Sequence, residues 1–99
     1  MILILGSVVV RDGQVDDAIR LSLEHVHRSR AEPGCIAHAV HRDCENPQRL
    51  VFVEEWQDDE SLRQHFKVPA SRTLVAELSA MAIEAPSMSI FSAERVGPE

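Results

Sequence analysis

Four potential zinc ligands recur at every third position in the first half of the chain: Cys35, His38, His41 and Cys44. Thiolate and imidazole groups are usual protein ligands of Zn²⁺. A spacing of three places side chains on one face of a helix, whereas side chains along a strand alternate between faces. A Pro-Gly turn followed by a β-type pattern predicts a strand here, with Cys35 and His41 on one face and His38 on the other. We therefore expect a polar sheet edge and a loop cysteine, and no metal site.

A second group combines a carboxylate, an indole and an imidazole: Glu54, Trp56 and His65. Glu54 and Trp56 are two residues apart in a predicted strand and share a face, and His65 lies on the inner side of the helix predicted to follow. If that face meets the helices, the three side chains border one apolar space, as in a small-molecule pocket. His65 would then be a general base, because histidine titrates near neutral pH. The residues expected to bind a substrate beside it are Ser7, Phe52, Leu62, Phe66 and Leu74.

The same three residues also fit a purely structural role. Trp56 would then fill the core, and Glu54 and His65 would form a hydrogen-bonded pair that closes the edge of the core. Both interpretations, a pocket and a filled core, remain open at the level of sequence.

Hydrophobic periodicity and turn formers predict the elements that must position these residues. Alternation predicts strands, and a spacing of three and four predicts helices, the second of which is interrupted at Pro69 because proline removes a backbone donor. The predicted elements are a strand at 2–10, a helix at 14–30, strands at 35–42 and 49–56, a helix from Asp58, a further helix at about 70–83 and a strand at 87–96. This β-α-β-β-α-β order predicts an α+β, ferredoxin-like split βαβ fold.

The first predicted strand is apolar on both faces, with Ile4 and Val8 on one and Leu3 and Leu5 on the other. A sheet that helices cover on one side normally carries polar residues on its other side. We therefore expect a second subunit to cover that face, in a homodimer.

Composition narrows the class of protein. The 99 residues, 44% hydrophobic and 26% charged, predict one folded domain spanning 1–99. Ten Lys and Arg against sixteen Asp and Glu give a net charge of −6, which repels a phosphate backbone, so we expect no nucleic-acid partner. No apolar run approaches the roughly 20 residues that cross a bilayer, and the apolar start lacks a basic leader. We expect a cytoplasmic protein with no membrane partner and two free cysteines.

Several short motifs, in the same order along nearly the whole chain, resemble the antibiotic biosynthesis monooxygenase (ABM) domain family. They are the run from Glu32 to Cys35, the Glu-x-Trp pattern at 54–56, and the segment 58–62 that leads to His65. The resemblance, closest to quinol monooxygenases, implies a dimeric α+β barrel in which two ferredoxin-like subunits pack sheet against sheet. For many members it also implies oxidation of phenols or hydroquinones by O2 with no metal, flavin or other prosthetic group.

Carried over position by position, Glu54, Trp56 and His65 match the family pattern. The resemblance implies that His65 is the base, Trp56 a pocket wall, and Glu54 the residue that orients His65 or a substrate hydroxyl. Two positions depart from the pattern. Where the family often has a second histidine this chain has Ala70, and where haem-degrading relatives have an asparagine on the first strand it has Ser7. The second departure argues against haem oxygenation, and we expect no cofactor.

The leading hypothesis is a cofactor-independent monooxygenase that oxidises a small hydroquinone, phenol or related enolisable compound with O2. One alternative is a non-oxidative enzyme on the same fold, an isomerase or a signal-molecule degrading protein, in which Glu54 and His65 shuttle a proton. The other alternative is a non-catalytic ligand-binding dimer.

Overall fold

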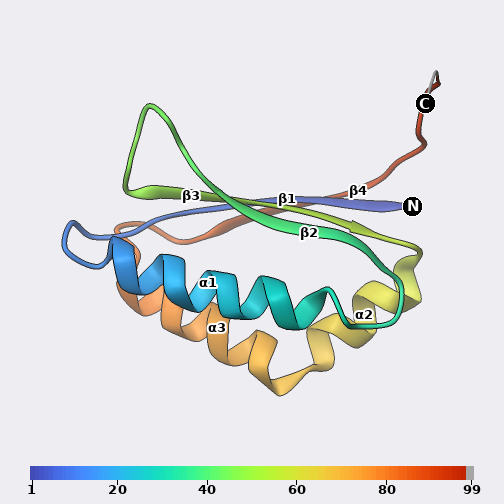
Figure 1. Cartoon of the computed structure of the whole chain (residues 1–99), viewed down its shortest axis with the longest axis horizontal. Coiled ribbons are helices and arrows are strands. Elements are labelled where there is room, and N and C mark those ends of the chain that lie inside the picture. Colours follow the sequence, from blue (N-terminus) through green and yellow to red (C-terminus); the bar gives the residue numbers. More distant parts are fainter. Residues whose placement is uncertain (98–99) are drawn as a thin grey trace.

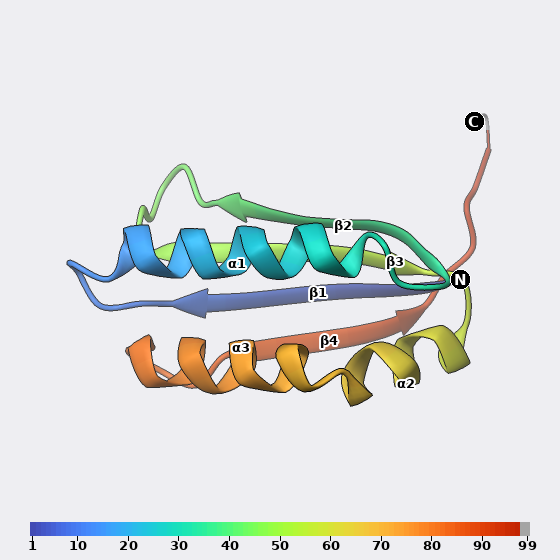
Figure 2. The ribbon, with the colours of Figure 1, turned by 60° about the horizontal axis from the view of Figure 1, so that its bottom comes forward.

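A four-stranded sheet and three helices form two layers in the computed structural model, which describes residues 1–97 (Figure 1). In chain order the elements are β1 (Ile2–Val9), α1 (Val15–Ser29), β2 (Cys35–Arg42), β3 (Arg49–Trp56), α2 (Asp59–Lys67), α3 (Pro69–Met81) and β4 (Ser87–Ser92). The strands are ordered β2-β3-β1-β4, and each neighbouring pair is antiparallel. The helices lie together on one side of the sheet (Figure 2). The predicted α+β, ferredoxin-like split βαβ fold is confirmed for the chain.

The observed boundaries differ from the predicted ones mainly in the second half of the chain. α3 begins at Pro69 itself, because the missing N–H of proline would have no partner in the first turn of a helix. Beyond α3, Ala82 forms an isolated antiparallel bridge with Val10. β4 ends at Ser92 rather than at the predicted position 96.

The face of the sheet that meets the helices carries the core. Along β3 every second residue is buried, ending with Phe52, Glu54 and Trp56, and β1 pairs Ile4 with Glu54. Phe52 belongs to a large apolar cluster with α1 and α3, whereas Trp56 packs with Ile4 and Leu62 in a smaller one. Glu54 therefore lies on β3 between two apolar clusters, where a carboxylate requires polar partners.

A β-bulge at the start of β2 decides which of its side chains face the helices. The pairing with β3 shifts by one residue between Cys35 and Ala37, so that Cys35 is opposite Trp56 and His38 is opposite Glu54. The extra residue reverses the alternation. Cys35 and His38 therefore share the inward face, and the prediction that they point in opposite directions is wrong.

The start of α2 is fixed by contacts that also set the turn before β2. The Asp58 carboxylate accepts hydrogen bonds from the backbone N–H and the hydroxyl of Ser61, each at 2.8 Å, which is an N-cap. Gly34 has a φ of 82°, and a side chain there would collide with the Ser61 hydroxyl. These contacts hold α2 so that Leu62 and His65 are its buried residues. Within residues 1–97, no helix has the length and apolar character needed to cross a membrane.

Candidate active site

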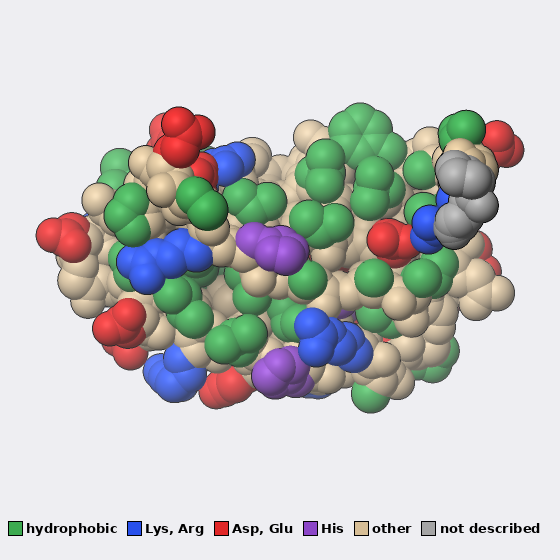
Figure 3. All heavy atoms as spheres, turned by 45° about the horizontal axis from the view of Figure 1, so that its top comes forward, with side chains coloured by type: hydrophobic (Ala, Val, Ile, Leu, Met, Phe, Trp, Pro, Cys, Tyr) green, Lys and Arg blue, Asp and Glu red, His purple; other side chains and the backbone are tan. Residues whose placement is uncertain are grey.

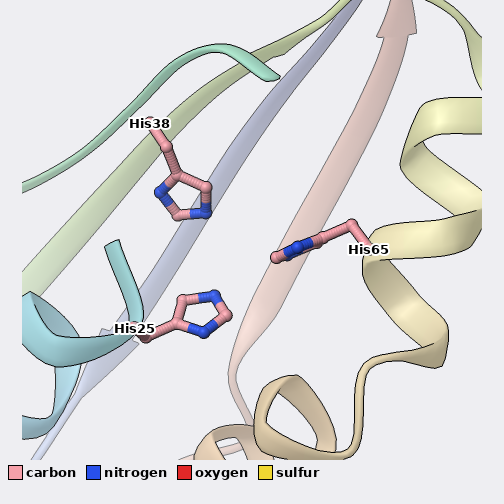
Figure 4. Close-up of side chains that lie close together, drawn as sticks. All are labelled: His25, His38 and His65. Atoms are coloured by element: carbon pink, nitrogen blue, oxygen red, sulfur yellow. The ribbon is translucent and has the colours of Figure 1, made fainter. Parts of the chain in front are cut away.

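Three histidines from three elements converge between the sheet and the helices: His25 of α1, His38 of β2 and His65 of α2 (Figure 4). Their exposed fractions are 6%, 1% and 3%. One ring nitrogen from each lies within 4.8 Å of the corresponding nitrogens of the other two. Burial of three imidazoles side by side is costly unless their nitrogens find partners.

Glu54 is the acceptor on which this cluster centres. Its Oε1 accepts a 2.9 Å hydrogen bond from the indole N–H of Trp56 and lies 3.3 Å from His38 Nε2 and 3.9 Å from His65 Nε2. Burial by itself raises the pKa of Glu54, but the contacts with His38, Trp56 and His65 outweigh it and lower the pKa below the ordinary value. Glu54 is therefore an ionised carboxylate at neutral pH.

His65 is held by a second carboxylate, that of Glu32. The distance between His65 Nδ1 and Glu32 Oε1 is 2.7 Å, and the ring centroid of His65 lies 4.6 Å from that of Trp56. When Nδ1–H donates to Glu32, Nε2 carries the lone pair and is free to accept a proton. Glu54, at 3.9 Å, is beyond hydrogen-bond distance. Of the two carboxylates, Glu32 and not Glu54 is therefore within hydrogen-bond distance of His65.

His25 is held on its outer side by Arg28, whose Nη2 donates to His25 Nδ1 at 2.6 Å. Burial is the largest cause that lowers the pKa of His25, followed by the neighbouring His38, His65 and Arg28; together they bring this pKa to about 3. His25 is therefore neutral at ordinary pH, with its proton on Nε2.

Two adjoining pockets open onto the cluster. The larger has a volume of about 240 Å³, and its lining includes His25, Glu54, His65, Phe66 and Arg72. The smaller, about 80 Å³, extends between β1 and α3; the two share His25, Glu54, Val75 and Met88. An imidazole and an ionised carboxylate therefore border apolar space in which a small molecule can be held.

The predicted catalytic residues meet as expected, but not all of them face the pockets. Glu54 and His65 line the larger pocket. Trp56, which was expected to form a pocket wall, is fully buried and lines neither of these pockets. Its ring packs beneath His65 and its N–H fixes Glu54.

Four of the five predicted substrate-binding residues line one of the two pockets, and the fifth lies in the core. Phe66 lines the larger pocket, and Phe52, Leu74 and Ser7 line the smaller. Strand alternation turns the Ser7 side chain to the outward face, where its hydroxyl bonds with Ser87. Leu62 packs with Ile4 and Trp56 in the small core cluster and lines neither pocket.

The sequence interpretation missed His25, His38 and Glu32 as parts of the site. For His25 a signal was present: it lies three residues after Ser22 and four before Ser29, both of them buried on the inner face of α1. For His38 the β-bulge at the start of β2 breaks the simple alternation from Cys35, so its direction could not be read from the sequence. Glu32 lies in a turn, where no periodicity indicates its direction.

The regular spacing of Cys35, His38, His41 and Cys44 does not correspond to a cluster. Cys35 packs against the small core cluster, and Cys44 is exposed in the loop after β2. His41 is opposite Val51 on the outward face. Only His38 of the four reaches the site.

Comparison with known proteins places the chain in a family. The sequence model described as "Antibiotic biosynthesis monooxygenase" matches residues 1–77. The chain belongs to the antibiotic biosynthesis monooxygenase family. Among solved structures, one described as an antibiotic biosynthesis monooxygenase shares 25% identity with it over 96% of this chain and 100% of its own, with a TM-score of 0.88.

Two further relatives of this ABM chain have names that state no activity. A conserved protein from Methanosarcina mazei is 26% identical, covering 94% of this chain and 92% of its own, with a TM-score of 0.88. An uncharacterised protein of Synechocystis is 31% identical over 68 residues, 69% of this chain. The match spans 46% of that relative, a little under half of its length.

Proposed function

We propose that this ABM protein is a monooxygenase that oxidises a small hydroquinone, phenol or related enolisable compound with O2. The observation that supports the proposal is the arrangement of His65, whose Nδ1 is held by Glu32 while the ring borders a pocket of about 240 Å³. A carboxylate behind one nitrogen sets the tautomer and leaves the other as a base.

In the proposed reaction His65 removes the phenolic proton of the bound substrate. The anion then donates electrons from a ring carbon to O2, and a carbon–oxygen bond forms. Loss of water from the resulting hydroperoxide breaks the O–O bond and leaves a carbonyl, so that one oxygen atom enters the product and the other leaves as water. The protein contributes deprotonation, position and exclusion of bulk water.

Oxygen uptake with a panel of hydroquinones, in protein treated with chelator, tests the proposal. His65→Ala is expected to lower kcat by about 10²- to 10⁴-fold, the usual contribution of a general base. His27→Ala is the matched control, because His27 is exposed on α1, and it should leave uptake unchanged. Equal rates in the two variants would remove His65 from the mechanism.

The non-oxidative alternative is supported by the two carboxylates, Glu32 and Glu54, on either side of His65. Such an arrangement also suits proton transfer between two positions of one substrate. The same substrate panel assayed without oxygen separates the two functions: conversion that persists anaerobically and depends on His65 would replace the monooxygenase proposal with an isomerase.

A further inference from the structure

We propose that His25, His38, His65 and Glu54 form a binding site for one divalent first-row transition-metal ion. Three imidazoles and one carboxylate are a ligand set that suits Zn²⁺, Fe²⁺, Co²⁺ or Ni²⁺. The proposal concerns binding and does not depend on the proposed oxidation.

The distances in the cluster fit ligands of a single ion. Two ligand atoms that are each about 2.0 Å from one ion at the tetrahedral angle are about 3.3 Å apart. Glu54 Oε1 is 3.3 Å from His38 Nε2 and 3.9 Å from His65 Nε2. The three imidazole nitrogens lie within 4.8 Å of one another, so a shift of about 1 Å in the side chains closes the set around an ion.

His38 is the member of the cluster whose ring nitrogens are least satisfied by the protein. It is 1% exposed, and neither of its ring nitrogens has a hydrogen-bond partner among the described residues, since its approach to Glu54 has the distance but not the geometry of a hydrogen bond. Buried polar groups are ordinarily satisfied, and an unpaired one costs about 1–3 kcal/mol. A metal ion would bind one of these two unpaired ring nitrogens.

The surroundings of the cluster match those of metal-binding histidines. Ligand histidines usually donate their second nitrogen to a carboxylate or carbonyl, and His65 makes this contact with Glu32 at 2.7 Å. Trp56 likewise fixes the Glu54 carboxylate. Because His25, Glu54 and His65 line the larger pocket, an ion has a path from the surface to the cluster.

Arg28 is the one contact that opposes the ion. Its guanidinium donates to His25 Nδ1, and a ligand histidine cannot accept that hydrogen bond while its other nitrogen binds a metal. Whichever nitrogen of His25 binds, Arg28 must move away. Replacement of Arg28 by glutamine should therefore raise the affinity for the metal severalfold, a direction that a merely structural role of these residues does not predict.

The test is a titration with Co²⁺ alone, because its visible absorption reports the coordination geometry. Untagged protein, stripped with a chelator, is expected to bind one equivalent per chain. His25→Gln, His38→Gln and His65→Gln should each weaken binding at least tenfold. His27→Gln on α1 and His41→Gln on β2 are matched controls on the same elements, both exposed, and should bind as the wild type does.

A second measurement uses wild-type protein, so that the proposal can be tested even if the histidine variants fail to fold. In ¹⁵N-labelled wild-type protein, Zn²⁺ should shift the imidazole nitrogens of His25, His38 and His65 and leave those of His27 and His41 unchanged. The proposal is overturned if folded protein takes up no Co²⁺, or if the Zn²⁺ shifts appear at the two exposed histidines. Oxygen uptake by chelator-treated protein is unaffected by either result, so the two proposals fail separately.

Discussion

Glu32 and Glu54 are both within 4 Å of His65, yet they act on different atoms. Glu32 lies 2.7 Å from Nδ1, whereas Glu54 is 3.9 Å from Nε2 and accepts instead from Trp56. A charged acceptor at Nδ1 stabilises the imidazolium that forms when Nε2 takes a proton, while a carboxylate near Nε2 borders the substrate space. The two carboxylates therefore have separable effects on the proposed oxidation.

Glu32→Gln removes the charge behind His65 but keeps an oxygen that accepts from Nδ1–H. We expect kcat to fall about tenfold or more, since the imidazolium loses its counter-charge, with little change in KM because Glu32 lines neither pocket. Steady-state oxygen uptake measures both constants. Glu24→Gln on the exposed side of α1 is the control; a rise in KM with unchanged kcat would place Glu32 in substrate binding instead.

At the level of single residues, the sequence predicts the site in part. Glu54 and His65 could be found because period-2 alternation and the inner face of a helix both point to the same layer. His38 could not, because alternation separates it from His41 without saying which of the two faces the helices, and the β-bulge at the start of β2 puts Cys35 on the same face as His38. The Cys/His spacing along one segment, which strand geometry excluded as a metal site, gives no indication of the cluster that exists, because that cluster is assembled from three elements.

The elements themselves are largely predictable, because each is marked by local chemistry. The ends of α2 and α3 follow from Asp58 and Pro69, and the strands follow from alternation. What local chemistry does not indicate is how α2 is held against the turn before β2. That contact depends on Gly34 and Ser61, which are far apart in sequence.

Ionised Asp58 is expected to make the stability of α2 depend on pH, because its carboxylate caps this helix. The backbone N–H of Ser61 is the largest cause that holds the pKa of Asp58 below its usual value. A carboxyl with a lowered folded-state pKa contributes stability above its unfolded pKa of about 3.9, and this contribution is lost as pH falls through the lower, folded-state value. Asp58→Ala should lower the melting temperature at neutral pH, because α2 loses its cap.

Asp58→Asn is the matched variant, since asparagine caps a helix without a charge. In melting curves from pH 7 to pH 2, the Asp58→Asn variant should stay close to the wild type at neutral pH, and the difference between Asp58→Ala and wild type should shrink in acid. A difference that stays constant across this range would assign the effect to the side chain's shape and not to its ionisation.

At the scale of the whole molecule, the sheet has one face covered by helices and one face open (Figures 1 and 2). Leu5 and Phe91 belong to the open face and are 44% and 46% exposed. Hydrophobic side chains are spread over this side of the molecule in Figure 3. Exposed apolar area of this kind is typical of a surface that pairs with another chain, which supports the homodimer proposed from sequence.

Leu5→Arg tests the proposed dimer, because a charge at the centre of an apolar interface is costly to bury unpaired. Light scattering coupled to size-exclusion chromatography should give twice the mass of one chain for the wild type and a shift toward the single-chain mass for Leu5→Arg. Leu23→Arg is the control: Leu23 is 40% exposed but lies on α1, on the helix side of the molecule. If both variants keep the double mass, the dimer uses another surface; if the wild type already has the single-chain mass, the homodimer proposal is wrong.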